Sequence, residues 1–343
     1  MLDKLKSNWF VVLVVIVLIG FTGYFIYDAN RDNVSGRQSD GKDVIASLGD
    51  EDITADALYD QGAPFDGSLL YNLYKNAVIS QTVETTSQLE EEAKTMEKTI
   101  DSNVKNSSGD QYKEAVTAEL AGYGYSSYDQ LYDYCLNSVK EKAMNKAYVQ
   151  DHFDELKAAV EEKNPRIVSQ IIVNVTDPDN LTEDEQNKLD SIDKALEAGT
   201  FADAATAFSD DAATAEKKGF SGYIDADSAS QGTTTVSSEA AAAALELNKG
   251  ETSSWITVTN SQTQATTMVK ITVDETDLDE ILKNEDETVQ DSLLYAVLND
   301  NTGLSYTIVE DSAKKLKITF TDEDTEKKIN EYVASRKGDG QNE

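Results

Sequence analysis

The apolar positions of residues 166–275 change their period several times, which predicts strands alternating with helices. The run RIVSQIIVNV (166–175) is apolar and rich in β-branched residues, as buried strands are. Thr182 and Glu185 then have the spacing of a helix capping box. The helix that follows has one apolar face, formed by Leu189, Ile192 and Leu196.

The remainder of this region continues the alternation. It contains a short helix FADAATAFSD (201–210), a strand GFSGYI (219–224), an alanine-rich helix ending in LELNKGE (245–251), and the strands WITVTN (255–260) and TTMVKITV (266–273). The predicted order is β, α, α, β, α, β, β in about a hundred residues, which is enough for one small domain.

The flanking segments have mostly helical periods. Residues 70–78 repeat apolar side chains at helical spacing, and LEEEAKTMEKTID (89–101) is a charged helical arm followed by a loop at 103–110. The longest helix is predicted from Ser127 to about Glu162, just before Pro165. Its apolar stripe consists of Leu131, Tyr132, Cys135, Leu136, Val139 and Ala143.

Nearer the two ends the patterns are shorter. From Asp43 we predict a hairpin with VIASL, a turn at Gly49 and Asp50, and a second strand around Ile53, after which Thr54 would cap a helix. After Glu275 the period becomes helical again, at Leu278, Ile281 and Leu282 and then at Leu293, Leu294, Val297 and Leu298. LSYTIVED and KLKITFTD, within residues 304–322, are predicted as short extended segments.

Residues 9–27 form a stretch of 19 residues without charge, long enough to cross a hydrocarbon core of about 30 Å as a helix. Lys4 and Lys6 precede this stretch and Asp28 follows it, which predicts a cytoplasmic N-terminus and an extracytoplasmic body. A cleavable signal peptide is the alternative, although its apolar region is usually 7–15 residues long and ends at a small-residue site. We therefore expect a single-pass cell-membrane anchor, followed by a polar tether at 29–42.

The net charge, the single cysteine and the single histidine exclude several classes of function. The formal net charge is −34, from 64 acidic and 30 basic side chains, which opposes nucleic-acid binding. The single cysteine, Cys135, is predicted as a core residue, and the single histidine, His152, as a surface or interlobe residue without a catalytic role. No nucleophile-elbow, P-loop or dinucleotide fingerprint is present, and no acidic run follows the EF-hand ligand order. We expect neither a metal nor a cofactor.

The same residues resemble the parvulin-type peptidyl-prolyl isomerases. The resemblance rests on RIVSQIIV, FADAATAFSDD before the glycine turn GFSGY, the helix leading into LNKGE, and the closing strand MVKITV. VIASLGDEDITADALYD (44–60) is similar to the opening of exported foldases of the PrsA and SurA type. The resemblance covers roughly residues 43–320. It implies an isomerase and chaperone that acts on exported polypeptides.

The resemblance also implies site residues. The family's two histidines fall on Gln170 and Thr267, and its Cys or Asp near the twisting carbonyl falls on Asp211. We expect Gln170 and Thr267 side by side on neighbouring strands. The larger pocket residues of the family fall on Val236, Ala240 and Leu245, of which Ala240 is a poor wall for a proline ring.

Together these expectations define an α+β chain. They comprise a stub and membrane-spanning helix (1–28), the tether (29–42), a helical chaperone lobe (43–164), an inserted parvulin-like domain with a four-stranded sheet (165–275), and a C-terminal segment that completes the lobe and ends in a frayed tail (276–343). Two functions remain open: a foldase with weak or lost isomerase activity, or a pure holdase or client-docking module. The expected partners are unfolded exported polypeptides, and the sequence leaves open whether two copies form a homodimer.

Overall fold

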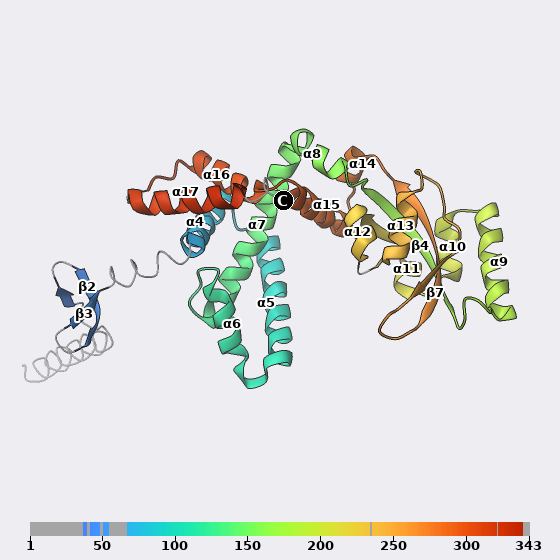
Figure 1. Ribbon diagram of the computed structural model, residues 1–343, viewed down its shortest axis with the longest axis horizontal. Helices are drawn as coiled ribbons and strands as arrows, with labels where there is room; N and C mark the ends of the chain where they lie inside the picture. Colours follow the sequence, from blue (N-terminus) through green and yellow to red (C-terminus); the bar gives the residue numbers. More distant parts are fainter. Residues whose placement is uncertain are drawn as a thin grey trace, which may run out of the picture. The chain divides into compact units, whose positions relative to one another are not determined.

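The computed structural model describes residues 37–39, 42–48, 51–54, 67–233, 235–320 and 322–338 of the 343-residue chain (Figure 1). The chain divides into two compact units, residues 1–70 and 71–343. The predicted anchor at 9–27 lies outside the described residues. Among those that are described, no helix is long and apolar enough to cross a membrane.

The first unit contains a three-stranded antiparallel sheet in the order β1-β2-β3. Its strands are β1 (Arg37–Ser39), β2 (Lys42–Leu48) and β3 (Glu51–Thr54). Leu48 pairs with Glu51, so the predicted hairpin is confirmed. Gly49 and Asp50, predicted as its turn, lie outside the described residues. The helix start predicted at Thr54 lies outside the described residues.

The second unit contains a helical lobe made from two parts of the chain (Figure 1). Its earlier part comprises α5 (Ser87–Ser108), α6 (Tyr112–Ala121), α7 (Leu131–Asp151), α8 (Phe153–Glu161) and most of α4 (Gly67–Thr82). Its later part comprises α14 (Leu278–Leu282), α15 (Glu287–Asp300), α16 (Leu304–Leu316) and α17 (Glu323–Gly338). Rings from the two parts meet, because Tyr71 lies 5.0 Å from Tyr306 and 5.5 Å from Tyr332 between centroids.

Three predictions for this lobe are corrected. The segment predicted as extended from 304 is α16, in which Leu304, Ile308, Ser312 and Ala313 are buried at helical spacing. The loop predicted at 103–110 is mostly the end of α5, and a short 3-10 turn follows at Gly109–Gln111. The helix predicted to reach Glu162 is broken at His152, whose ring stacks on Tyr148 at 4.3 Å.

Between the two parts of the lobe lies a four-stranded antiparallel sheet in the order β5-β4-β7-β6. Its strands are β4 (Arg166–Val175), β5 (Phe220–Ile224), β6 (Ile256–Thr259) and β7 (Thr266–Glu275). The helices of this region are α9 (Glu183–Ala198), α10 (Phe201–Phe208), α11 (Ala212–Glu216), α12 (Ala226–Gln231) and α13 (Ser238–Leu245). The four strands and three of these helices follow the predicted order, and the short helices α11 and α12 are additional.

Each face of this sheet has its own apolar core, because successive side chains of a strand point to opposite faces. Val168, Val269 and Ile271 pack with the alanines of α13 on one face. Ile171 and Val173 pack with α9 and α10 on the other. The buried Arg166 guanidinium donates to the carbonyl oxygens of Ala244 and Leu247, which fastens the end of α13 to β4.

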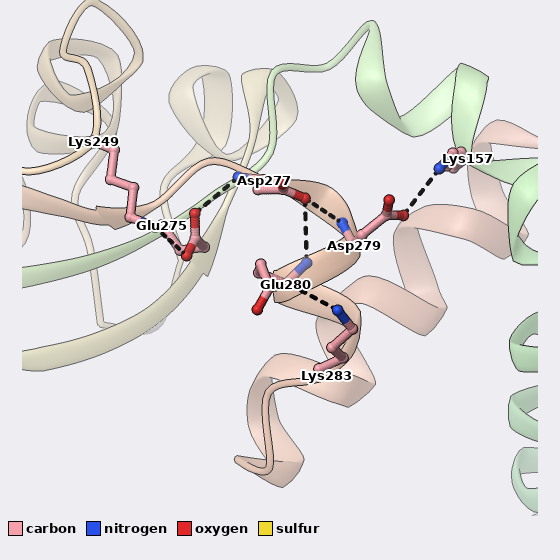
Figure 2. Close-up of polar contacts among 7 residues, drawn as sticks. All are labelled: Lys157, Lys249, Glu275, Asp277, Asp279, Glu280 and Lys283. Atoms are coloured by element: carbon pink, nitrogen blue, oxygen red, sulfur yellow. Dashed lines mark hydrogen bonds and ion pairs between the residues drawn. The ribbon is translucent and has the colours of Figure 1, made fainter.

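The exit from β7 is stabilised by local polar contacts (Figure 2). Glu275 pairs with Lys249 at 2.6 Å and accepts from the backbone N–H of Asp277 at 3.1 Å. Asp277 caps α14 by accepting from the backbone N–H of Asp279 at 2.9 Å. Asp279 in turn pairs with Lys157 of α8 at 2.9 Å, so the chain returns directly to the helical lobe.

Candidate functional site

Gln170 lies in the middle of β4, on the sheet face covered by α13. Its side chain is only 2% exposed, and Nε2 donates to the carbonyl oxygen of Thr235 at 2.5 Å. Its backbone N–H donates to Gly219 O at 2.8 Å. Gly219 has a φ of +91°, and a Cβ there would lie 3.2 Å from Gln170 O, so this turn requires glycine. Gln170 therefore holds the segments around Gly219 and Thr235 to the sheet, through hydrogen bonds that do not depend on pH because an amide does not titrate.

Thr267 lies on the neighbouring strand β7, and on the same face, but not beside Gln170. The residue opposite Gln170 is Ile271, whereas Thr267 lies opposite Asn174. Four positions along a strand correspond to about 13 Å. The expectation that Gln170 and Thr267 lie side by side is therefore wrong, and the two side chains cannot form a direct hydrogen bond.

Asp211 is held at the edge of β4 by its neighbours in the chain. The backbone N–H of Asp210 donates to Ile172 O at 2.7 Å, and the Asp210 carboxylate accepts from the backbone N–H of Asn174 at 2.9 Å. Asp211 then caps α11, accepting from the backbone N–H of Thr214 at 2.8 Å and from the Thr214 hydroxyl. These contacts fix the Asp211 carboxylate at one position.

Asp211 lines an open hollow of about 410 Å³, which we call the Asp211 hollow. Ile172 and Phe220 form its apolar wall, and Thr235 lies in its rim. Thr288 and Ser292 of α15 also line it. Of the six predicted site residues, only Asp211 lines this hollow.

The predicted pocket residues are placed differently. Val236 and Ala240 are completely buried, where they pack in the core between α13 and the sheet. They present no surface to a substrate, so in this structure they are core residues and not pocket walls. Leu245 is half-buried at the end of α13, and its carbonyl oxygen accepts from the Asn164 side chain at 3.4 Å.

Sequence reasoning missed the contribution of α15 and of Tyr223. Tyr223 is in β5, inside the matched glycine-turn segment, so its position was predictable but not its role. Thr288 and Ser292 follow the sheet domain by more than a dozen residues, and no local pattern links them to it. Only the packing of α15 against β5 brings them to the hollow.

The arrangement supplies groups that can bind a peptide. The hollow offers an apolar wall, hydroxyls, one carboxylate and Lys217. Within the described ranges, no group of His, Cys, Asp and Glu residues is suited to hold a metal ion. Such a surface can bind a peptide and can favour a twisted amide only through hydrogen bonds and contact area.

The sheet order, the capped α11 and the glycine turn together give the geometry of one small domain, residues 166–275. Residues 171–265 match the family described as Rotamase, PPIC-type PPIASE domain, so the chain contains a domain of this family. The prediction of a parvulin-type domain is confirmed.

The wider resemblance to PrsA- and SurA-type proteins is found as well. The foldase protein PrsA of Streptococcus pneumoniae is 18% identical, with 84% of this chain and 99% of that chain covered at a TM-score of 0.41. PrsA of Bacillus subtilis is 22% identical, with coverages of 84% and 98% and a TM-score of 0.40. A SurA-like chaperone of Campylobacter jejuni is 14% identical, with coverages of 82% and 100% and a TM-score of 0.23. A search of curated proteins found no match.

Proposed function

We propose that this chain is a membrane-anchored, extracytoplasmic foldase and chaperone for unfolded or partly folded exported polypeptides. In this proposal the isomerase activity of its parvulin-type domain is weak or lost. The observation that carries it is the match of residues 171–265 to the PPIC-type domain, combined with the open Asp211 hollow. X-Pro bonds isomerise over tens to hundreds of seconds, slowly enough to limit the folding of an exported chain.

The contacts of the site support weak isomerisation. Ile172 and Phe220 are the apolar walls left for a proline ring, because Val236 and Ala240 face the core. A loss of 40–120 Å² of apolar contact would correspond to about 1–3 kcal/mol. Since about 1.4 kcal/mol is tenfold in rate, such a loss would lower catalysis by roughly one to two orders of magnitude.

The membrane attachment in this proposal rests on the charge-free stretch 9–27 and its flanking charges. A tether outside the membrane would keep the body near emerging chains. The high negative charge would keep it soluble and would weakly attract basic client segments.

A pure holdase or client-docking module is the second candidate. It is favoured by the burial of Val236 and Ala240 and by the use of Gln170 to hold Thr235. In this alternative the parvulin-type domain only binds polypeptides.

Two measurements on the full-length chain in detergent micelles test these proposals. We expect micromolar protein to accelerate cis-trans isomerisation of an Ala-Pro peptide by less than about tenfold, compared with a parvulin that has both histidines as positive control. We expect equimolar protein to suppress aggregation of a reduced, unfolded client. Acceleration equal to that of the control would contradict weakened activity, an unchanged rate would favour the holdase, and no effect in either assay would refute the foldase proposal.

A further inference from the structure

A second hollow, of about 460 Å³, adjoins the Asp211 hollow along α15. Three carboxylates line it, those of Asp225, Asp227 and Asp291, and no Lys or Arg is among its lining residues. We call it the acidic hollow. A cavity of this size can hold one long side chain together with part of a peptide backbone.

Two buried polar atoms in its wall lack a well-formed hydrogen bond within the described residues, although the Asp225 carboxylate lies next to one of them, the Tyr223 hydroxyl. Tyr223 is 8% exposed and lines both hollows, and its hydroxyl forms no hydrogen bond of good geometry with the described residues. Burial raises the pKa of Tyr223, and the adjacent Asp225 carboxylate raises it further, so the phenol stays protonated. Asp291 Oδ1 is likewise buried and unpartnered within the described part of the chain. Buried polar groups are normally satisfied, so these atoms indicate a ligand.

The lysines that pair with these carboxylates do not line the hollow. Lys163 pairs with Asp227 at 3.2 Å, and Lys142 pairs with Asp291 Oδ2 at 2.6 Å. Asp225 is 6% exposed and caps α12 through the backbone N–H of Ser228 at 3.0 Å. The hollow is therefore lined by carboxylates, while the lysines paired with two of them stand outside its lining. Tyr295, which is 72% exposed, adds an aromatic ring suited to a cation–π contact.

The two hollows adjoin each other, since Tyr223, Thr233, Thr288 and Ser292 line both. Thr288 and Asn299 mark the extent of the acidic hollow along α15. Along the helix, the eleven steps from Thr288 to Asn299 correspond to about 16 Å. An extended peptide covers that length in about five residues.

We propose that the acidic hollow binds a Lys or Arg side chain of the same polypeptide whose proline enters the Asp211 hollow. This inference rests on the proposed function and specifies its substrate class: prolyl segments with a basic residue within about five positions of the proline. The ammonium or guanidinium group donates to Asp291 Oδ1 and to the other carboxylates, and it stacks on Tyr295.

The test uses labelled peptides and the full-length chain in nonionic detergent. The peptides are uncharged chains with a central Ala-Pro, carrying either Lys or norleucine four positions before or four positions after the proline. Fluorescence anisotropy gives the Kd of each at low and high salt. For one of the two placements we expect the Lys peptide to bind about 5- to 10-fold more tightly than its norleucine partner, with a smaller ratio at high salt.

Asp291→Asn is the diagnostic variant, and Glu287→Gln is its matched control. Both residues are on α15 and both pair with Lys142, at 2.6 and 3.6 Å, but only Asp291 lines the hollow. We expect Asp291→Asn to remove most of the preference for Lys. Glu287→Gln should keep it within about twofold, because exposed charges contribute little.

Equal Kd values for Lys and norleucine peptides at both placements would overturn the inference. So would an equal loss of the preference for Lys in Asp291→Asn and Glu287→Gln. The proposed function fails separately. If replacing proline by alanine leaves the Kd of every peptide unchanged while Asp291→Asn still weakens the Lys peptide, the acidic hollow stands and the prolyl site does not. If replacing proline weakens binding and replacing Lys does not, the prolyl site stands and the acidic hollow does not.

Discussion

At the scale of single residues, Gln170 shows what one strand position can and cannot predict. Its place in an apolar run predicts a buried strand residue, and the structure confirms that burial. Its partner Thr235 lies 65 residues away, and no local pattern contains that contact. Cys135 is the simpler case, because its helical neighbours predict a core thiol. It is fully buried, and burial raises its pKa to about 11, so the thiolate is suppressed.

Gln170→Ala tests whether this amide stabilises the site. The substitution removes a buried side chain and leaves the Thr235 carbonyl without its donor. We expect the free energy of unfolding to fall by about 2–4 kcal/mol. Urea denaturation followed by circular dichroism measures it.

The matched control is Gln186→Ala, since Gln186 is exposed on α9 and its side chain donates to Asp190 of the same helix. Its effect should stay within about 0.5 kcal/mol. Similar losses for the two variants would show that the Thr235 contact contributes nothing specific.

At the scale of elements, the start of α9 was predictable from the sequence. The capping box of Thr182 and Glu185 is present at the start of α9, with reciprocal bonds of 3.3 and 2.7 Å. It was predictable because both partners lie within one turn. The extended segment predicted from 304 failed because Thr307, Ile308 and Val309 favour strands, whereas the buried positions of α16 recur at helical spacing.

The relative placement of strands was not predictable in the same way. Flanking apolar residues place Gln170 on β4 and Thr267 on β7 correctly. Their offset of four positions depends on the register of two strands about a hundred residues apart. This register is not encoded in local periodicity.

Glu185 makes the stability of the start of α9 depend on pH. Backbone N–H groups of Thr182 and Thr176 donate to its carboxylate and lower its pKa to about 2, from an ordinary value of 4.5. Because the folded state favours the ionised form, its stabilisation is complete above about pH 4.5 and is lost as the pH falls towards 2. The Tm of the wild type should therefore exceed that of Glu185→Gln at pH 6, and the difference should vanish near pH 2.

Differential scanning calorimetry between pH 2 and 6 measures this difference. Glu183→Gln is the control, because Glu183 is exposed in the same helical turn and its side chain makes no hydrogen bond to the described residues. A constant Tm difference for Glu185→Gln across the range would contradict the capping role.

At the scale of the whole second unit, α15 connects the helical lobe to the sheet domain. It packs against α7, α8 and β5, and Figure 1 shows it between the helical lobe and the sheet domain. Its apolar residues Val289, Leu293 and Val297 are buried, so its helical period was predictable. Its contact with β5 was not, because the two elements are separated by more than sixty residues.

This shared helix predicts that the lobe and the sheet domain unfold together. Leu293 is 1% exposed, and Leu293→Ala should lower the free energy of unfolding by about 2–5 kcal/mol. In a Trp9→Phe background the fluorescence of Trp255, whose indole N–H donates to Asp193 at 3.3 Å, reports on the sheet domain. Circular dichroism at 222 nm reports chiefly on the helical lobe.

We expect both probes to shift to lower urea by the same amount, because α15 contacts both the helical lobe and β5 of the sheet domain, so lost packing of this helix weakens both at once. Tyr295→Ala, on the exposed side of the same helix, should move neither probe by more than about 0.5 kcal/mol. A shift of the circular dichroism transition alone would mean that the sheet domain is stable without α15. In that case the Asp211 hollow would lose the residues contributed by α15 whenever the lobe opens, and peptide binding would follow the stability of the lobe.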